Sequence, residues 1–206
     1  MNKTMKKITL FMLLIMLPSG IFTAQANGER ENERIAFLGI GSGNLRSNYY
    51  PDEIIAGKMN VPEDSINETF GRRFYEILNE TCVRNGTPNI VYCCFEEGRA
   101  ILASVKYNSR GDEMESDLSA VSQERLDDFF EQTSTGYLMI IDQYYIKREG
   151  YPYHNVSHIV AYSVYDSKRE IVFRGRHQFS SLDMEEFSRY TRQFSKIAQK
   201  LLAKIH

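Results

Sequence analysis

Residues 158–179 read HIVAYSVYDSKREIVFRGRHQF, and this stretch decides the fold. Two apolar runs, 158–165 and 170–179, flank a polar linker of four residues, which predicts a β-hairpin. The second run alternates between two faces. One face carries Ile171, Phe173, Gly175, His177 and Phe179, and the other carries Val172, Arg174, Arg176 and Gln178. Because successive side chains of a strand point in opposite directions, one side of this sheet is expected to be packed and the other to face water.

Helices and further strands are predicted on either side of the hairpin. Apolar residues recur at helical spacing over residues 66–78, from Ser122 to Phe130, and over residues 187–205. Short apolar runs predict strands at residues 34–40, 90–95 and 137–145. We therefore expect an α/β (α+β) fold, with a single mixed β-sheet of four to five strands and about three helices packed on it.

Some segments are less strongly patterned. Residues 98–107 fit a short helix and a strand equally well, and residues 41–59 and 108–119 are expected to be loops. In the strand at residues 34–40, Ile35 and Phe37 are expected on one face, with Ala36, Leu38 and Ile40 on the other.

The first 26 residues have the pattern of a secretory signal peptide. Lys3, Lys6 and Lys7 precede an uncharged apolar run over residues 8–17, and Ala24 and Ala26 are small residues at positions −3 and −1 of a cleavage site. The apolar run is too short to span a bilayer. We expect cleavage after Ala26, with residues 27–206 forming a single α/β domain that is periplasmic or extracellular.

Charge and composition narrow the classes of partner. Removing the three leader lysines from 25 basic residues leaves 22 against 27 acidic ones, a net charge of −5. A mildly acidic chain without clustered basic residues is a poor nucleic-acid ligand, so no nucleic-acid partner is expected. No later run is long enough for a transmembrane segment. No cysteine lies near the cleavage site, so no lipid anchor is expected.

The three cysteines leave two alternatives open. An oxidising compartment permits Cys82 to form a disulfide with Cys93 or Cys94, but the same residues also suit buried positions as small apolar side chains. Neighbouring residues of a strand point to opposite faces, so Cys82 can reach only one of the pair.

No candidate catalytic or cofactor motif outweighs its structural interpretation. The glycines in residues 39–43 are not followed directly by a helix, as a phosphate-binding loop requires. His154 and His158 lie about 13 Å apart along an extended strand, too far to share a metal ion. His177 is expected to be a hydrogen-bonded residue of the packed face, and Asp142 to mark the exit of a strand to water. No metal or cofactor is therefore expected.

An aromatic stretch is the best candidate for binding a partner. It comprises Tyr144, Tyr145, Tyr151 and Tyr153, with Lys147 and Arg148 between them. Tyrosine offers a large contact area at low entropy cost and is enriched where proteins bind each other. Arg174 and Arg176 are expected to form a basic strip beside it. The alternative is an ordinary hairpin that packs its own rings.

The C-terminal half resembles a domain found in bacterial envelope proteins. The matching pieces are the helix at 122–130, the run TGYLMIIDQ at residues 135–143, the hairpin at 161–175 and the closing helix. The group includes the curli-secretion lipoprotein, lipoprotein activators of penicillin-binding proteins and the N-terminal domain of the Tol–Pal translocation protein. The chain departs from it in lacking a cysteine for lipid attachment and in having Gln143 where a glycine is common. The resemblance implies an interaction domain without catalytic residues.

The expected function is that of an exported, non-enzymatic accessory domain for another envelope protein or a cell-wall component. The alternatives are a secreted hydrolase with an unrecognised site, for which Cys93, Cys94, Asp142 and His177 are the candidates, and a small-ligand-binding protein with an apolar pocket of some hundreds of Å³.

Overall fold

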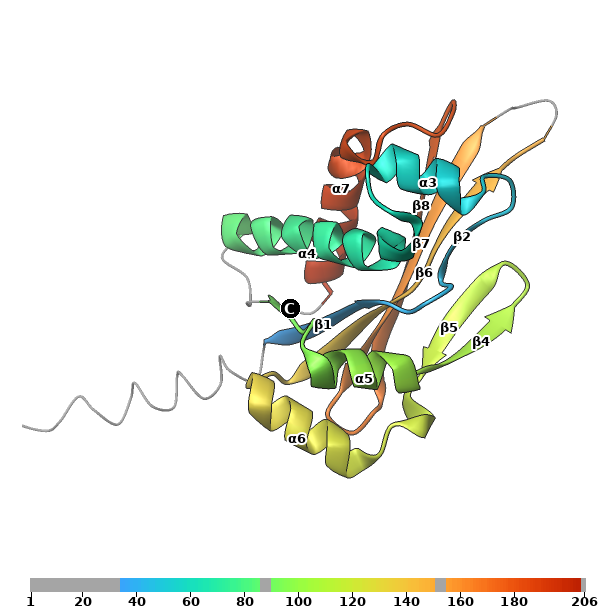
Figure 1. The fold of residues 1–206 in the computed structure, drawn as a ribbon. Helices are drawn as coiled ribbons and strands as arrows, with labels where there is room; N and C mark the ends of the chain where they lie inside the picture. Colours follow the sequence, from blue (N-terminus) through green and yellow to red (C-terminus); the bar gives the residue numbers. More distant parts are fainter. Residues whose placement is uncertain (1–33, 86–89, 151–154, 205–206) are drawn as a thin grey trace, which may run out of the picture.

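The computed structural model describes residues 34–85, 90–150 and 155–204 (Figure 1). The predicted signal peptide, residues 1–26, lies outside the described residues, as do Tyr151, Tyr153 and His154. The strands are β1 (Ile35–Ile40), β2 (Leu45–Ser47), β3 (Ile90–Tyr92), β4 (Lys106–Arg110), β5 (Glu113–Asp117), β6 (Tyr137–Arg148), β7 (Val156–Asp166) and β8 (Ile171–Ser181). The α-helices are α3 (Asp52–Met59), α4 (Ile66–Asn85), α5 (Glu96–Ser104), α6 (Gln123–Thr133) and α7 (Thr191–Leu202). Short 3-10 turns lie at η1 (Glu63–Ser65), η2 (Leu118–Ala120) and η3 (Phe187–Tyr190).

The expected fold class is confirmed. The main sheet is mixed and has the order β3-β1-β6-β7-β8, with β2 pairing along the far part of β6. β1 runs parallel to both β3 and β6, whereas β6, β7 and β8 form an antiparallel meander. The predicted hairpin at residues 158–179 is therefore β7 and β8, and its partner is the apolar strand predicted at residues 137–145, here β6.

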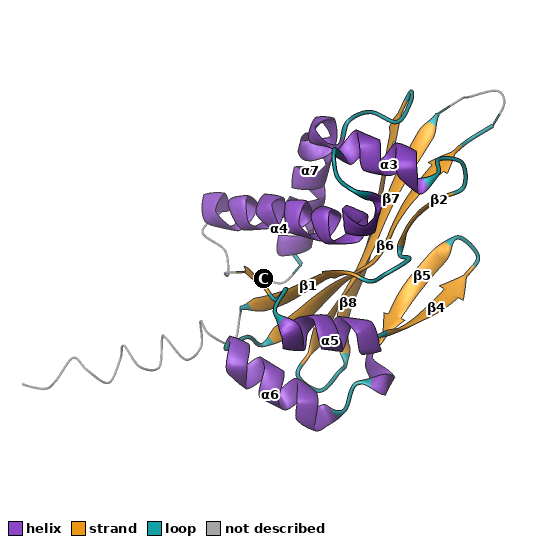
Figure 2. Ribbon diagram, in the orientation of Figure 1, coloured by secondary structure: helices purple, strands orange, loops and turns teal. Residues whose placement is uncertain are grey.

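Helices cover both faces of this sheet, as Figure 2 shows. α3, α4 and α7 lie on the first face, where Ile55, Phe70 and Phe194 belong to the larger apolar core. α5 and α6 lie on the second face, where Ile101 and Leu126 belong to a smaller core. The rest of the second face carries the separate two-stranded sheet of β4 and β5.

Two β-bulges reverse the alternation of side chains in the central strands. In β1 the register shifts between Phe37 and Gly39, where Gly39 adopts a φ of +95° that favours glycine. As a result Ile40 lies in the larger core with Ile35 and Phe37, and the prediction that it shares a face with Ala36 and Leu38 is wrong. In β6 the shift falls at Asp142, between Ile141 and Gln143.

Three weakly patterned segments are resolved or corrected by the structure. Residues 98–107, which fitted helix and strand equally, form most of α5 and the start of β4. The expected loop at 41–59 contains β2 and α3, and the expected loop at 108–119 contains most of the β4–β5 hairpin. These last strands escaped prediction because their side chains are mostly polar, so they lack the apolar alternation by which strands are recognised.

The C-terminal helix closes the larger core as its apolar stripe predicts. The ring of Phe194 lies 5.0 to 5.9 Å, between centroids, from the rings of Phe70, Phe74, Tyr144, Phe179 and Phe187. Within the described residues, no helix combines the length and apolar character needed to cross a bilayer.

Replacing Phe194 with alanine is expected to lower the free energy of unfolding by about 3–5 kcal/mol, because it empties the centre of this ring cluster. Urea unfolding followed by circular dichroism measures the loss. Lys196→Ala, at an exposed position of the same helix, is the matched control and should change stability by less than about 0.5 kcal/mol. Equal losses for the two variants would contradict this assignment of the core.

Candidate functional site

The predicted aromatic stretch is divided between the two faces of the sheet. Tyr144 is 2% exposed and lies in the larger core, where its ring stacks on Phe70 at 4.5 Å between centroids. Tyr145 points to the second face, where the Arg46 guanidinium lies 5.0 Å from its ring centroid. Tyr144 is therefore buried and offers no surface to a partner. The bulge at Asp142 is the reason: before it Ile140 points into the smaller core, and after it Tyr144 points into the larger one.

The neighbouring strand β7 places a buried, neutral histidine against Tyr144. His158 is fully buried; Tyr144 Oη lies 2.8 Å from its Nδ1, and Ser181 Oγ lies 3.0 Å from its Nε2. The ring also stacks on Phe179 at 4.7 Å between centroids. Burial lowers the pKa of His158 to about 4, because the charged imidazolium would lose its hydration.

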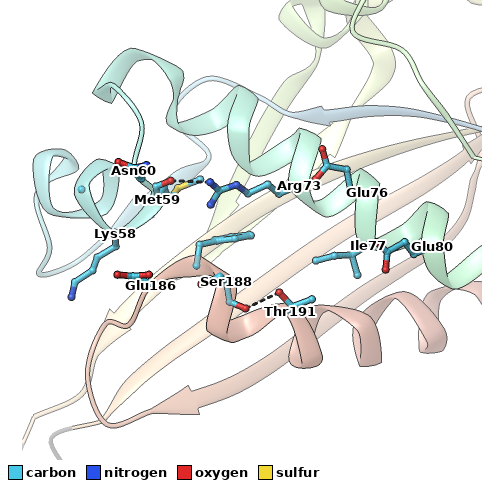
Figure 3. Close-up of a pocket in the computed structure, with 12 residues that line it drawn as sticks. Lys58, Met59, Asn60, Arg73, Glu76, Ile77, Glu80, Glu186, Ser188 and Thr191 are labelled. Atoms are coloured by element: carbon cyan, nitrogen blue, oxygen red, sulfur yellow. Dashed lines mark hydrogen bonds between the residues drawn. The ribbon is translucent and has the colours of Figure 1, made fainter.

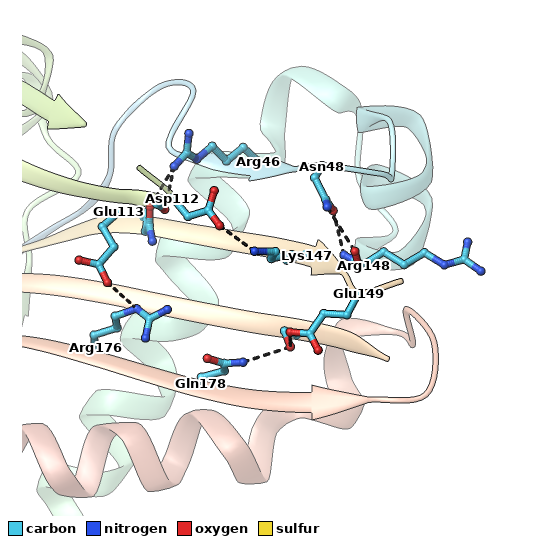
Figure 4. A network of polar contacts seen from close by, with 11 residues as sticks. Arg46, Asn48, Asp112, Glu113, Lys147, Arg148, Glu149, Arg176 and Gln178 are labelled. Carbon is cyan, nitrogen blue, oxygen red and sulfur yellow. Dashed lines mark hydrogen bonds and ion pairs between the residues drawn. The ribbon is translucent and has the colours of Figure 1, made fainter. Parts of the chain in front are cut away.

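Arg174 and Arg176 lie on the second face, as the alternation of β8 predicts. Arg174 pairs with Glu115 at 2.9 Å and Arg176 with Glu113 at 3.3 Å, so both are held by the β4–β5 hairpin. Arg46 and Lys147 join them on the same side, as Figure 4 shows. We call these four residues, Arg46, Lys147, Arg174 and Arg176, the basic face. The prediction included two of its arginines but missed Arg46, because nothing in the sequence indicates that β2 lies beside β6.

Asp142 does not mark an exit to water, and that prediction is wrong. It lies in the middle of β6, 2% exposed, and its Oδ2 accepts a hydrogen bond of 2.6 Å from Ser163 Oγ. Its Oδ1 accepts from the backbone N–H of Ser116 at 3.2 Å and from the Ser116 hydroxyl. Burial raises the pKa of Asp142, and these hydrogen bonds oppose the shift. The carboxylate thus joins the base of the β4–β5 hairpin to the main sheet.

The other candidates for chemistry have structural partners. Tyr162 Oη lies 3.2 Å from His177 Nε2, so His177 is a hydrogen-bonded residue of the packed face, as expected. Cys93 is buried, which raises the pKa of its thiol to about 12, and Cys94 is exposed. Both are free thiols, so the alternative of a bridge from Cys82 to either is not formed here. Among the residues that the structure describes, neither Cys93 nor Asp142 is hydrogen-bonded to an imidazole.

The glycines at residues 39–43 lead into β2 and not into a helix. The loop therefore places no helix N-terminus beside the glycines, which is the feature that phosphate binding requires.

A hollow of about 520 Å³ lies between α3, α4 and η3 (Figure 3). Arg73 crosses it, donating to the carbonyl of Met59 at 2.9 Å and lying 5.4 Å from the ring centroid of Phe187. Its lining is mostly polar or charged and includes Lys58, Asn60, Glu76, Glu80, Glu186, Ser188 and Thr191. It differs in character from the apolar pocket that the small-ligand alternative requires.

Several elements near the end of β6 and the start of β7 carry exposed apolar side chains. Tyr49 is 57% exposed, and the Arg148 guanidinium lies 4.1 Å from its ring centroid. Leu182 is 85% exposed and lines a hollow together with Asn155, which directly precedes β7. Ile54, near the start of α3, is 45% exposed. We call these residues, Tyr49, Ile54, Arg148 and Leu182, the hairpin-end surface.

Polar contacts hold the hairpin-end surface in place. The Asn48 side chain accepts a hydrogen bond of 2.8 Å from the Arg148 N–H and donates one of 3.3 Å to its carbonyl. Tyr50 Oη donates to Asp183 Oδ1 at 2.7 Å, which ties the loop after β2 to the loop after β8. This surface is related to the predicted partner site through Arg148, which belongs to both. Tyr151 and Tyr153, which complete the predicted site, follow Arg148 closely in the sequence. The sequence signal that was available for it is Tyr49-Tyr50-Pro51 in an otherwise polar stretch.

No family model and no curated protein matches this sequence. Among solved structures, the PelC dodecamer from Paraburkholderia phytofirmans is similar, with a TM-score of 0.40 and 9% identity over 81% of this chain and 86% of that chain. A second structure, of a variant PelC dodecamer from the same organism, has a TM-score of 0.41 and 9% identity over 84% of this chain and 90% of that chain. A Xanthomonas campestris protein with the family model DUF330 has a TM-score of 0.26 and 12% identity over 52% of this chain and 78% of that chain. These similar structures come from outside the three envelope groups that the C-terminal half resembles.

The stability of the protein is expected to fall as the pH drops from about 6.5 to about 4. The unfolded chain binds a proton at His158 near pH 6.5, whereas the folded protein binds it only near pH 4. Between these values the unfolded state carries more protons, so acid favours unfolding, by about 3 kcal/mol in all for this group. Urea unfolding at several pH values measures this slope.

His158→Gln is expected to remove that part of the acid dependence, whereas His177→Gln, at a partly exposed histidine, should retain most of it. A wild-type curve that stays parallel to that of His158→Gln between pH 6.5 and 4 would contradict the assignment.

Proposed function

We propose that this chain is an exported cell-envelope domain that acts by binding another protein through the hairpin-end surface. The observation that carries the proposal is the exposure of Tyr49 under the Arg148 guanidinium, with exposed Ile54 in the helix that follows and exposed Leu182 in the loop tied to Tyr50 through Asp183. Isolated apolar residues on a surface are ordinary, but an aromatic ring, two aliphatic side chains and an arginine together have the composition of a protein-binding surface.

The ordering of this end supports the same function. Tyr49 and Tyr50 lie edge to face, with 5.0 Å between ring centroids. The hydrogen bonds of Asn48 and Tyr50 join the loop after β2 to the end of β6 and to the loop after β8. A surface that is fixed before contact loses less conformational entropy on binding. Tyr151 and Tyr153, in the connection between β6 and β7, are proposed to extend the surface.

Export is the second part of the proposal and rests on the leader pattern of residues 1–26. The destination is the periplasm or the cell exterior, and the partner is another envelope protein. A cell-wall component is the alternative partner.

N-terminal sequencing of the protein recovered from its native cells is expected to begin at Asn27. Cleavage by signal peptidase after Ala26 is the reason. Recovery of a chain that begins at Met1 from the cytosol would contradict the export part of the proposal and leave the binding part open to its own test.

Photocrosslinking in the native envelope tests the binding surface. A photoreactive residue in place of Tyr49 or of Leu182 is expected to capture the same protein, and a second change, Ile54→Glu, should abolish capture at both positions. Val83, an exposed residue on α4, is the matched control and should not capture that protein. Capture of wall fragments alone would favour the cell-wall alternative. Identical products from Tyr49 and Val83 would contradict a localised surface.

A further inference from the structure

A different surface, the basic face, is partly covered by a segment of the chain itself. The β4–β5 hairpin lies over it, and its acidic residues face the four cations. Asp112 pairs with Lys147 at 2.8 Å, and its carbonyl accepts a hydrogen bond of 3.0 Å from Arg46. Glu113 and Glu115 stand two residues apart along β5, and they pair with Arg176 and Arg174, which stand two apart along β8. The occupant of the basic face is thus the turn at Asp112 together with the first residues of β5, where Glu113 and Glu115 alternate along the strand.

The outer part of this hairpin is weakly held. β4 and β5 pair as strands only with each other and form a sheet of their own. A two-stranded hairpin is marginal without further packing. Around its turn, the pairs of Asp112 with Lys147 and of Glu113 with Arg176 have side chains between 38% and 54% exposed, and ion pairs in this setting contribute little.

The inner end is fixed in contrast. Ser116 is fully buried, and its N–H donates to Asp142. The carbonyl of Ser116 accepts two hydrogen bonds, one of 2.7 Å from Tyr165 Oη and one of 3.1 Å from Arg174. Ser116 is therefore held by more contacts than the outer residues 108–114 are.

Two polar atoms under the hairpin are left without partners among the described residues. Gln143 is fully buried, and its Nε2 makes no hydrogen bond, although its Oε1 lies 3.3 Å from Arg46 Nη2. The Nε of Arg46 is also buried and unpaired. Leaving buried donors unsatisfied costs free energy. A ligand that accepts hydrogen bonds from Gln143 Nε2 and Arg46 Nε would recover part of that cost.

We infer that the outer part of the β4–β5 hairpin is an internal cover of a second binding surface, and that an extended acidic segment of a partner protein displaces it. The displacing segment supplies carboxylates to Arg176 and Lys147. Its backbone carbonyls accept from Arg46, as the carbonyl of Asp112 does in the closed arrangement, and from Gln143 Nε2. The inference is independent of the hairpin-end surface, since the two surfaces share none of their defining residues.

Peptide binding to the full chain tests the inference. The probe is a fluorescein-labelled octapeptide that alternates glutamate with serine, and binding is followed by fluorescence anisotropy. The double variant Asp112→Asn/Glu113→Gln removes two contacts that hold the cover, so it should bind the probe about tenfold more tightly than the wild type. Glu68→Gln, which breaks an exposed ion pair with Arg99 elsewhere, is the matched control and should bind as the wild type does.

Two further measurements separate displacement from simple attraction of charge. Arg176→Gln, which removes a half-exposed member of the basic face, should weaken binding at least fivefold, while a peptide with glutamine in place of glutamate should not bind. Hydrogen exchange of residues 110–114 should become faster when the glutamate peptide binds, because these amides leave the β4–β5 ladder.

Equal affinity of the probe for the wild type and for Asp112→Asn/Glu113→Gln, with both folded, would overturn the inference. Slower exchange at residues 110–114 would do so as well, since it would mean that the peptide binds on top of the closed hairpin. Inorganic polyphosphate that binds as tightly as the glutamate peptide would also overturn the inference, because the basic face would then bind any polyanion and not an acidic protein segment in particular.

Discussion

The arrangement of this molecule depends on the bulge at Asp142 in the central strand β6. One extra residue opposite Ala161 shifts the alternation of side chains, so that Ile141 and Tyr144 both enter the larger core. The bulge also brings a carboxylate into the interior, where a charged group requires hydrogen-bond donors. Ser116 and Ser163 provide them, and one of these donors belongs to the β4–β5 hairpin. A single irregularity in β6 therefore decides what covers each face of the sheet.

The two faces differ because of this irregularity. The first face is sealed by aromatic packing, in which α7 supplies Phe194 and α4 supplies Phe70 and Phe74. On the second face, α5 and α6 cover only the region before the bulge, where Leu138 and Ile140 point toward them. Beyond the bulge this face also carries charged side chains, among them Lys147 and Arg176, and the β4–β5 hairpin forms ion pairs with them. A stable apolar layer and a weakly held polar cover thus lie on opposite sides of the same strands.

The hairpin-end surface lies beyond the bulge, whereas the basic face spans it, from Arg174, which is level with Ile140, to Lys147. The hairpin-end surface is formed by loops that polar contacts fix in place, whereas the basic face is formed by strand residues whose charges an internal segment already pairs. The first has its binding groups exposed, and the second must lose an internal contact before a partner can reach it. This difference predicts different salt dependence for the two, because only the second exchanges one set of ion pairs for another.

The sequence by itself determined the fold class, because the hairpin of β7 and β8, the apolar run of β6 and the stripe of α7 each carry a strong period. It also determined that Arg174 and Arg176 share one face, since alternation along a regular strand is local. The burial of Tyr144, the interior position of Asp142 and the partners of the two arginines were decided only by the tertiary structure. A bulge arises from the pairing of one strand with its neighbours, and the polar β4–β5 hairpin becomes ordered only against charges that lie far away in the chain. Neither of these leaves a periodic signal in the residues concerned.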